Sequence, residues 1–180
     1  MMKSLLKTIL LTLLVISAFA AAEDEAIVSA KLLSSVDKLQ TGSAQKVAIE
    51  IDINEKWHIN ANDPGEAYLF PSEITFDSLP HVTVGDIDYP IAEEVSFSFA
   101  ENPIFVYHDV VYAYSTVMVS PEYAGKTITL SGKIDFQACN DLVCLLPQKA
   151  EFSLEIPVAG EGETIQKMNT GFFFEDKAEN

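Results

Sequence analysis

The chain has 180 residues, 48% of them hydrophobic, and a formal net charge of −16, with 27 acidic side chains against 11 lysines and no arginine. This length favours a single domain with a packed core. The shortage of basic side chains argues against nucleic acids and anionic membranes as partners, because both bind to basic patches.

The first 22 residues are typical of a secretory signal peptide. Lys3 and Lys7 precede the apolar run 9–16, and small residues follow at 17–22 before the expected cleavage site. The run is too short to span a membrane, so we expect no span after cleavage. The mature chain, with 27 acids and 9 lysines, would carry a charge of −18 and be periplasmic or secreted. In such oxidising compartments paired cysteines form disulfides.

Residues 23–158 are predicted to form one all-β domain. Turn-forming residues such as Pro80 and Pro90 separate short apolar runs, and the pair His108-Asp109 predicts a hairpin. Short strands without a long helix predict an antiparallel β-sandwich. The predicted strands are 26–33, 46–53, 73–76, 82–87, 95–99, 104–107, 110–119 and one on each side of the two cysteines.

The segment 159–180 is predicted to be an acidic C-terminal tail. Three consecutive phenylalanines, Phe172 to Phe174, interrupt its polar sequence. We expect these aromatic side chains to dock on the domain, although they could instead form a contact for another protein.

Cys139 and Cys144 are the only cysteines, and they lie between two predicted strands. Turn chemistry at Asn140-Asp141 predicts a hairpin with one cysteine at each side of its loop. Facing residues of such a hairpin have Cα atoms about 4.5–5.5 Å apart, and a disulfide spans about 4.4–6.8 Å. Alternation supports the flanking strands at Ile128, Leu130, Ile134 and Phe136, and at Phe152, Leu154, Ile156 and Val158.

Three interpretations of the cysteine pair are open from the residues alone. A structural disulfide in so small a ring would stabilise the fold by only roughly 2 kcal/mol, and it would join segments that a hairpin already holds together. A reactive disulfide would exchange with other thiols. Half of a zinc site is the third, with His58 and His108 as possible further ligands, although these two histidines lack paired ligand spacing.

The sequence FQACNDLVCLLP at residues 136–147 resembles the Tyr-Gln-Ala-Cys-Asn-Asp-x-x-Cys-x-x-Pro signature of the amino-terminal periplasmic domain of DsbD thiol–disulfide interchange proteins. Upstream, WHINANDP at 57–64 and YLFP at 68–71 resemble a second signature of that domain. The similarity covers roughly residues 28–158. Family members often have five residues between the cysteines and a tyrosine at the first position, whereas this chain has four residues and Phe136.

The resemblance implies an immunoglobulin-like sandwich in which Cys139 and Cys144 are the catalytic pair. It implies that the pair accepts electrons from a thioredoxin-like protein or a membrane thiol transporter and passes them to oxidised envelope proteins, as one component of a protein-disulfide reductase system. Because no further segment follows the tail, we expect the electron donor to be a separate protein. We expect no cofactor and no metal. The alternative is a non-catalytic interaction module whose disulfide only fixes a binding hairpin.

Three further expectations concern the surroundings of the cysteines. In the family an aromatic loop covers the pair, and residues 95–103 match that loop, so Phe97 or Phe99 is the candidate cap or partner contact; core packing would also explain both. His58 is expected to be a hydrogen-bonded packing residue, although it could orient a thiol. The charge of Asp141 disfavours a thiolate, so we expect neither cysteine to be strongly acidic.

Overall fold

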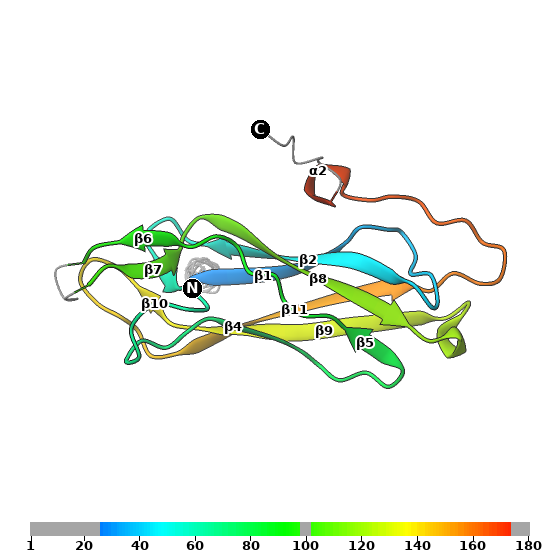
Figure 1. The fold of residues 1–180 in the computed structure, drawn as a ribbon, viewed down its shortest axis with the longest axis horizontal. Helices are drawn as coiled ribbons and strands as arrows, with labels where there is room; N and C mark the ends of the chain where they lie inside the picture. The colour runs from blue at the N-terminus through cyan, green and yellow to red at the C-terminus, as the bar shows by residue number, and fades with distance from the viewer. Residues whose placement is uncertain (1–25, 98–101, 174–180) are drawn as a thin grey trace, which may run out of the picture.

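The computed structural model describes residues 26–97 and 102–173, which form an antiparallel β-sandwich (Figure 1). The predicted signal peptide lies outside these residues, and the domain boundaries stay predictions. One sheet has the order β1 (Val28–Ser34), β2 (Ala44–Ile53), β8 (Val110–Val119), β5 (Val82–Val84). The second has the order β11 (Gln148–Pro157), β9 (Thr127–Phe136), β4 (Glu73–Phe76).

A third, smaller sheet has the order β10 (Ala138–Cys139), β3 (His58–Asn60), β7 (Ile104–Tyr107), β6 (Glu93–Val95). Every strand pairing in the three sheets is antiparallel. The predicted all-β, immunoglobulin-like sandwich is confirmed. The short helical segments are η1 (Pro121–Tyr123) and α2 (Thr170–Phe173). Within the described ranges, the structure contains no helix with the length and apolarity that a membrane crossing requires.

Alternating apolar residues of the two larger sheets form one core. Burying side chains of this size stabilises a fold by about 1.5–3 kcal/mol each relative to exposure. The inward positions are those expected from the alternation of apolar residues along the strands. They include Val47, Ile49, Ile51 and Ile53 in β2, Ile128, Leu130, Ile134 and Phe136 in β9, and Phe152 and Ile156 in β11.

The hairpin predicted at His108-Asp109 is wrong, because β7 and β8 belong to different sheets. Asp109 adopts a left-handed backbone conformation with φ 57°, and the chain passes there from the small sheet to β8 beside β2. The strand predicted at 95–99 is wrong for its described part, because β6 covers Glu93–Val95 and ends at the pair Val95↔Ile104, where β7 begins. Residues 98 and 99 of that prediction lie outside the described residues. The strand predicted at 82–87 ends at Val84.

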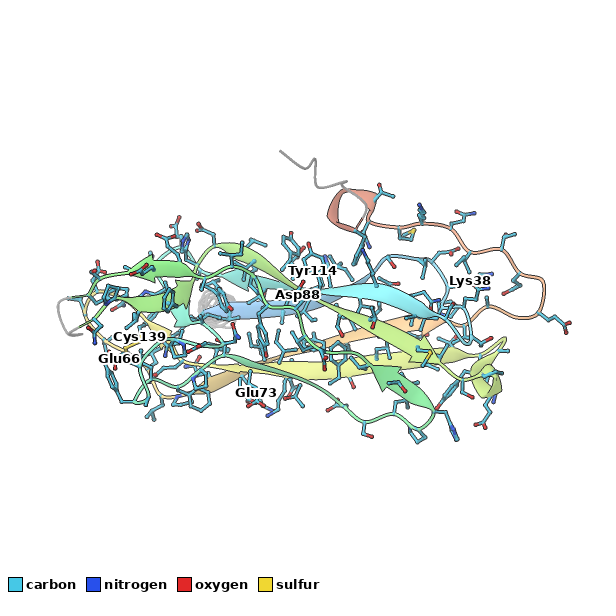
Figure 2. All side chains as sticks on the ribbon, viewed as in Figure 1. Lys38, Glu66, Glu73, Asp88, Tyr114 and Cys139 are labelled. Atoms are coloured by element: carbon cyan, nitrogen blue, oxygen red, sulfur yellow. A yellow bond between two sulfur atoms is a disulfide. The ribbon has the colours of Figure 1, made fainter. Side chains whose placement is uncertain are left out.

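Gln137 lies where the chain that carries the cysteines changes sheets. β9 ends at Phe136 and pairs with β11 and β4, whereas β10 begins at Ala138 and pairs with β3. Cys139 is thereby placed at the end of the sandwich where β6, β7 and β10 gather, on the left in Figures 1 and 2.

The tail returns along the sandwich after residue 158 (Figure 1). Asn169 Nδ2 donates a hydrogen bond to Ser34 O at 2.9 Å. Phe173 in α2 is 7% exposed, and its ring centroid lies 6.1 Å from that of Tyr114. The expected docking is therefore confirmed for Phe173, whereas the side chains of the two neighbouring phenylalanines lie outside the described residues.

Candidate functional site: a disulfide hairpin at one end of the sandwich

Cys139 and Cys144 face each other across a tight hairpin and form a disulfide. Backbone hydrogen bonds with N···O distances of 3.0 and 2.9 Å join the residues that flank the two cysteines, not the cysteines themselves. The cysteines are therefore a non-hydrogen-bonded pair, the kind in which facing side chains approach most closely. Their Cα atoms lie 4.0 Å apart, so the predicted hairpin pairing is confirmed at a somewhat shorter separation than expected.

The two cysteines differ in their access to solvent. Cys139 is 0% exposed, whereas Cys144 is exposed. Three apolar side chains of the same loop are also exposed, Leu142 at 93%, Val143 at 49% and Leu146 at 84%. An incoming sulfur can therefore reach Cys144 over an apolar surface but cannot reach Cys139 from solvent.

Asn140 closes the four-residue loop between the cysteines. Its side-chain Oδ1 accepts hydrogen bonds from Leu142 N at 2.9 Å and from Val143 N at 3.0 Å. This is an Asx turn, in which a side chain satisfies backbone donors that the short loop leaves without carbonyl partners. The Asn-Asp turn signal of the sequence thus has its physical basis in Asn140.

Gln137 connects the hairpin to a buried asparagine. Its Nε2 donates to Leu145 O at 3.0 Å, and its Oε1 accepts a hydrogen bond from Asn60 Nδ2 at 3.2 Å. Asn60 is 0% exposed and also donates through Nδ2 to Phe70 O at 2.9 Å. One amide pair therefore holds together the hairpin, β3 and the loop that follows β3.

His58 lies on the other side of Cys139 from Cys144, because β10 pairs with β3 in the register Cys139↔His58. The imidazole is half-buried and stacks on Phe97, with ring centroids 4.7 Å apart and an interplanar angle of 25°. Its buried Nε2 has no hydrogen-bond partner among the described residues, so the predicted hydrogen-bonded packing role is wrong at this atom. Phe99 lies outside the described residues.

The electrostatic surroundings of His58 are mixed. Burial lowers the pKa of His58, the Asp141 carboxylate raises this pKa, and His108 lowers it. The carboxylates of Glu93 and then of Asp109 accept hydrogen bonds from the His108 imidazole and raise the pKa of His108 above its ordinary value. Lys149, the nearest lysine in sequence after Cys144, pairs with a carboxylate of its own strand.

Residues 27–156 match the family model described as thiol:disulfide interchange protein DsbD, N-terminal. The chain belongs to this family. Together with the Cys139–Cys144 disulfide, this membership supports a thiol–disulfide interchange domain.

Solved structures add weaker similarities to this DsbD-type domain. The N-terminal periplasmic domain of ScsB from Proteus mirabilis shares 17% identity with a TM-score of 0.47, over 74% of this chain and 49% of that one. A family 123 glycoside hydrolase from Clostridium perfringens shares 10% identity with a TM-score of 0.29, over 76% of this chain and 28% of that one. The chain thus spans about half of the ScsB domain's length. No curated protein matches the sequence.

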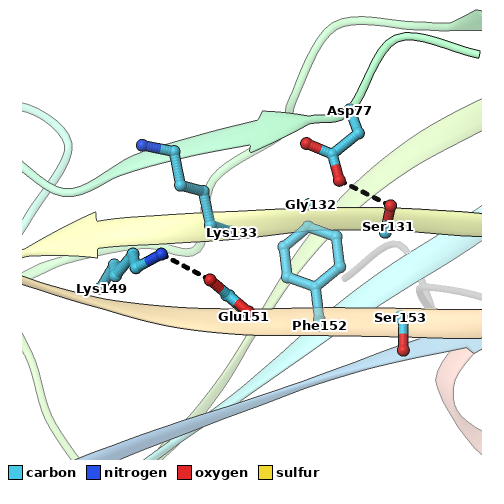
Figure 3. A pocket seen from close by; sticks show the side chains of 8 residues that line it. All are labelled: Asp77, Ser131, Gly132, Lys133, Lys149, Glu151, Phe152 and Ser153. Carbon is cyan, nitrogen blue, oxygen red and sulfur yellow. Dashed lines mark hydrogen bonds and ion pairs between the residues drawn. The ribbon is translucent and has the colours of Figure 1, made fainter.

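A pocket on β9 and β11 lies outside the DsbD-type site (Figure 3). Its polar side chains bond to one another: Lys149 Nζ lies 2.5 Å from Glu151 Oε1, and Ser131 Oγ donates to Asp77 Oδ2 at 2.6 Å. Lys133, which also lines the pocket, pairs with Asp135. Because the charged groups of the pocket are paired in this way, the disulfide hairpin remains the candidate site.

In the structure, the two sulfurs that the zinc interpretation would use as ligands are bonded to each other as a disulfide. Among residues 26–97 and 102–173, no group of three or more His, Cys, Asp or Glu side chains is placed to hold a metal ion. His58 does lie beside Cys139, but the neighbouring His108 bonds to Glu93 and Asp109 instead of to sulfur.

Proposed function

We propose that the domain carries two electrons as a Cys139/Cys144 dithiol–disulfide in the periplasm or in a secreted form. A thioredoxin-like protein or a membrane thiol transporter supplies the electrons, and oxidised envelope proteins receive them. The observation that carries this proposal is the asymmetric burial of the disulfide, with Cys144 exposed and Cys139 at 0% exposure. A disulfide that only fixed a hairpin would not need one sulfur that is accessible among the exposed side chains of Leu142, Val143 and Leu146.

The exchange proceeds through a mixed disulfide on Cys144. The Cys144 thiolate attacks a sulfur of the oxidised partner, whose S–S bond breaks and whose other sulfur leaves as a thiolate. Cys139 then attacks Cys144, the Cys139–Cys144 bond forms, and the partner's second sulfur leaves. Two electrons and two protons have then passed from the domain to its partner, and reloading of the domain follows the same steps in reverse.

Phe97 is the proposed cover of this site. Its ring stacks on His58, which lies in register with the buried cysteine. We assign the capping role to Phe97 because this stack places its ring over the strand that pairs with β10. A partner that displaces this ring would gain access to the disulfide.

Two cysteine variants test the proposed function. Cys139→Ser should trap a mixed disulfide through Cys144 with a thioredoxin-like protein that lacks its resolving cysteine, because the buried sulfur that would release the partner is gone. Cys144→Ser leaves only the buried Cys139 and should trap little or none. The assay is a non-reducing gel of both variants against the same partner.

The outcomes separate the two classes of function. Trapping by Cys139→Ser alone supports the exchange and the assigned roles. Trapping by neither variant, together with a reduction potential below about −300 mV, as is typical of structural disulfides, would instead indicate an interaction module with a fixed hairpin.

A further inference from the structure

The buried sulfur of Cys139 has an ionisable neighbour in register. Cys144 faces Cys139 on one side, and His58 faces it on the other, across the β10–β3 pairing. Facing residues of antiparallel strands present their side chains on the same side of the sheet, with Cβ atoms about 4.5–5.5 Å apart. The row Cys144–Cys139–His58 therefore places an imidazole beside the sulfur that solvent cannot reach.

The imidazole has an unused nitrogen in this oxidised state. His58 Nε2 is buried and without a hydrogen-bond partner among the described residues. Buried polar atoms are almost always paired, so one that is unpaired requires an explanation. A disulfide sulfur carries no proton, whereas reduction creates a thiol at Cys139 that can share its proton with an imidazole nitrogen. A reduced Cys139 would therefore offer Nε2 a hydrogen-bond partner that the disulfide does not offer.

We propose that His58 is the proton partner of Cys139 in thiol–disulfide exchange. The inference rests on the proposed function. It adds to the site a residue that lies outside the cysteine-bearing segment 136–147. Cys139 needs such a partner because it is 0% exposed and cannot pass its proton directly to water.

The proton step balances in both directions. When the domain reduces a partner, the Cys139 proton moves to His58 Nε2, and the resulting thiolate attacks Cys144. The bond to the partner's sulfur breaks, and that sulfur leaves with the electron pair and takes up a proton from water. When the domain is reduced, an incoming thiolate attacks Cys144, the Cys139–Cys144 bond breaks, and the leaving Cys139 sulfur takes its proton from the His58 imidazolium.

The charged surroundings suit this role. Burial lowers the pKa of His58, so the imidazole is mostly neutral at neutral pH and able to accept a proton. The Asp141 carboxylate acts in the opposite direction, and it would stabilise the imidazolium that forms. His108, held by Glu93 and Asp109, opposes that imidazolium and favours return of the proton.

Stacking on Phe97 is the purely structural role that a test must separate from proton transfer. His58→Phe keeps an aromatic ring for the stack but cannot titrate. His58→Gln keeps hydrogen-bonding atoms but also cannot titrate. His81→Gln is the matched control, because His81 is an exposed histidine that pairs with Glu122 and directly precedes β5, at the other end of Figure 1 from β10.

The experiment is reduction of the full chain by dithiothreitol from about pH 4 to about pH 8, a range that extends below the usual histidine range because burial lowers the pKa of His58. Each rate is divided by the thiolate fraction of dithiothreitol. For the wild type, the corrected rate should rise at least about tenfold as the pH falls through the His58 pKa, because a positioned acid contributes about 10²–10⁴-fold to a proton-transfer step. His81→Gln should keep this profile, whereas both His58 variants should give flat profiles.

A flat wild-type profile, or a His58→Phe profile like that of the wild type, overturns the inference. If His58→Phe does not fold, as judged by its urea midpoint, His58→Gln decides in its place. Failure of the proposed exchange function gives a different result, because Cys139→Ser would then trap no partner in the gel assay. Trapping together with an unchanged pH profile in the His58 variants would remove only the proton role.

Discussion

Replacing Gln137 with leucine removes two hydrogen bonds that tie the disulfide hairpin to the buried end of β3. In the wild type, Gln137 Nε2 lies 3.0 Å from Leu145 O, and Gln137 Oε1 lies 3.2 Å from Asn60 Nδ2. A leucine has approximately the same size but can make neither hydrogen bond. Asn60 keeps its bond to Phe70 O at 2.9 Å. The hairpin that presents Cys144 then has no side-chain bond to Asn60.

The magnitude follows from these contacts. A neutral hydrogen bond contributes about 0.5–1.5 kcal/mol net, so losing two costs about 1–3 kcal/mol. We expect a cost in the lower half of this free-energy range for two reasons. Leu145 is only partly buried, so its carbonyl can bond to water instead. Asn60 Nδ2 keeps its hydrogen bond to Phe70 O. For a chain of this length, about 1–2 kcal/mol lowers the melting temperature by about 2–8 °C.

Thermal unfolding of the oxidised protein, followed by circular dichroism, measures this loss. Gln148→Leu is the matched control, because Gln148 is exposed in β11 and should leave the melting temperature within about 2 °C of the wild type. Equal melting temperatures for the two variants would refute the claim that the amide pair of Gln137 and Asn60 secures the hairpin.

Two further predictions test the core and the cover of the site. Gly132→Ala should lower the free energy of unfolding by about 1–3 kcal/mol, because the added Cβ would lie 2.4 Å from Thr75 O and 2.7 Å from the Phe152 ring. Gly171→Ala, with no neighbouring atom within 4 Å of the new Cβ, should leave the urea midpoint unchanged, and equal midpoints for both variants would contradict the packing argument. Phe97→Ala should speed reduction by dithiothreitol several-fold, because access to the sulfurs contributes to the exchange rate. An unchanged rate in the folded variant would remove Phe97 as the cover.

Local signals predicted most of the sandwich. Alternation identified the strands on both sides of the cysteines, because burial of one face imposes a period of two on the sequence. The turn at Asn140 was predictable because it is also local: the Asn140 side chain accepts hydrogen bonds from the backbone of its own loop. The facing of Cys139 and Cys144 follows directly from these two local features.

The sequence analysis failed for features that depend on which strands pair with each other. The connection at His108-Asp109 has the length of a hairpin turn, but whether a turn returns to the same sheet depends on the available neighbours of β7 and β8. The register of His58 with Cys139 likewise joins two strands that are distant in sequence. The sequence contains the histidine but no local signal that places it beside the buried cysteine.

The burial of Cys139 determines what can happen to a mixed disulfide once it forms on Cys144. Since Cys139 is 0% exposed, sulfurs from solvent or from a second partner cannot attack it. The hairpin holds Cys144 opposite it, with 4.0 Å between the Cα atoms. Well-oriented intramolecular groups react with effective molarities of about 10⁵–10⁸ M, far above any free thiol. In the proposed exchange, Cys139 therefore displaces the partner before a second thiol can intervene, so that electrons leave the domain in pairs.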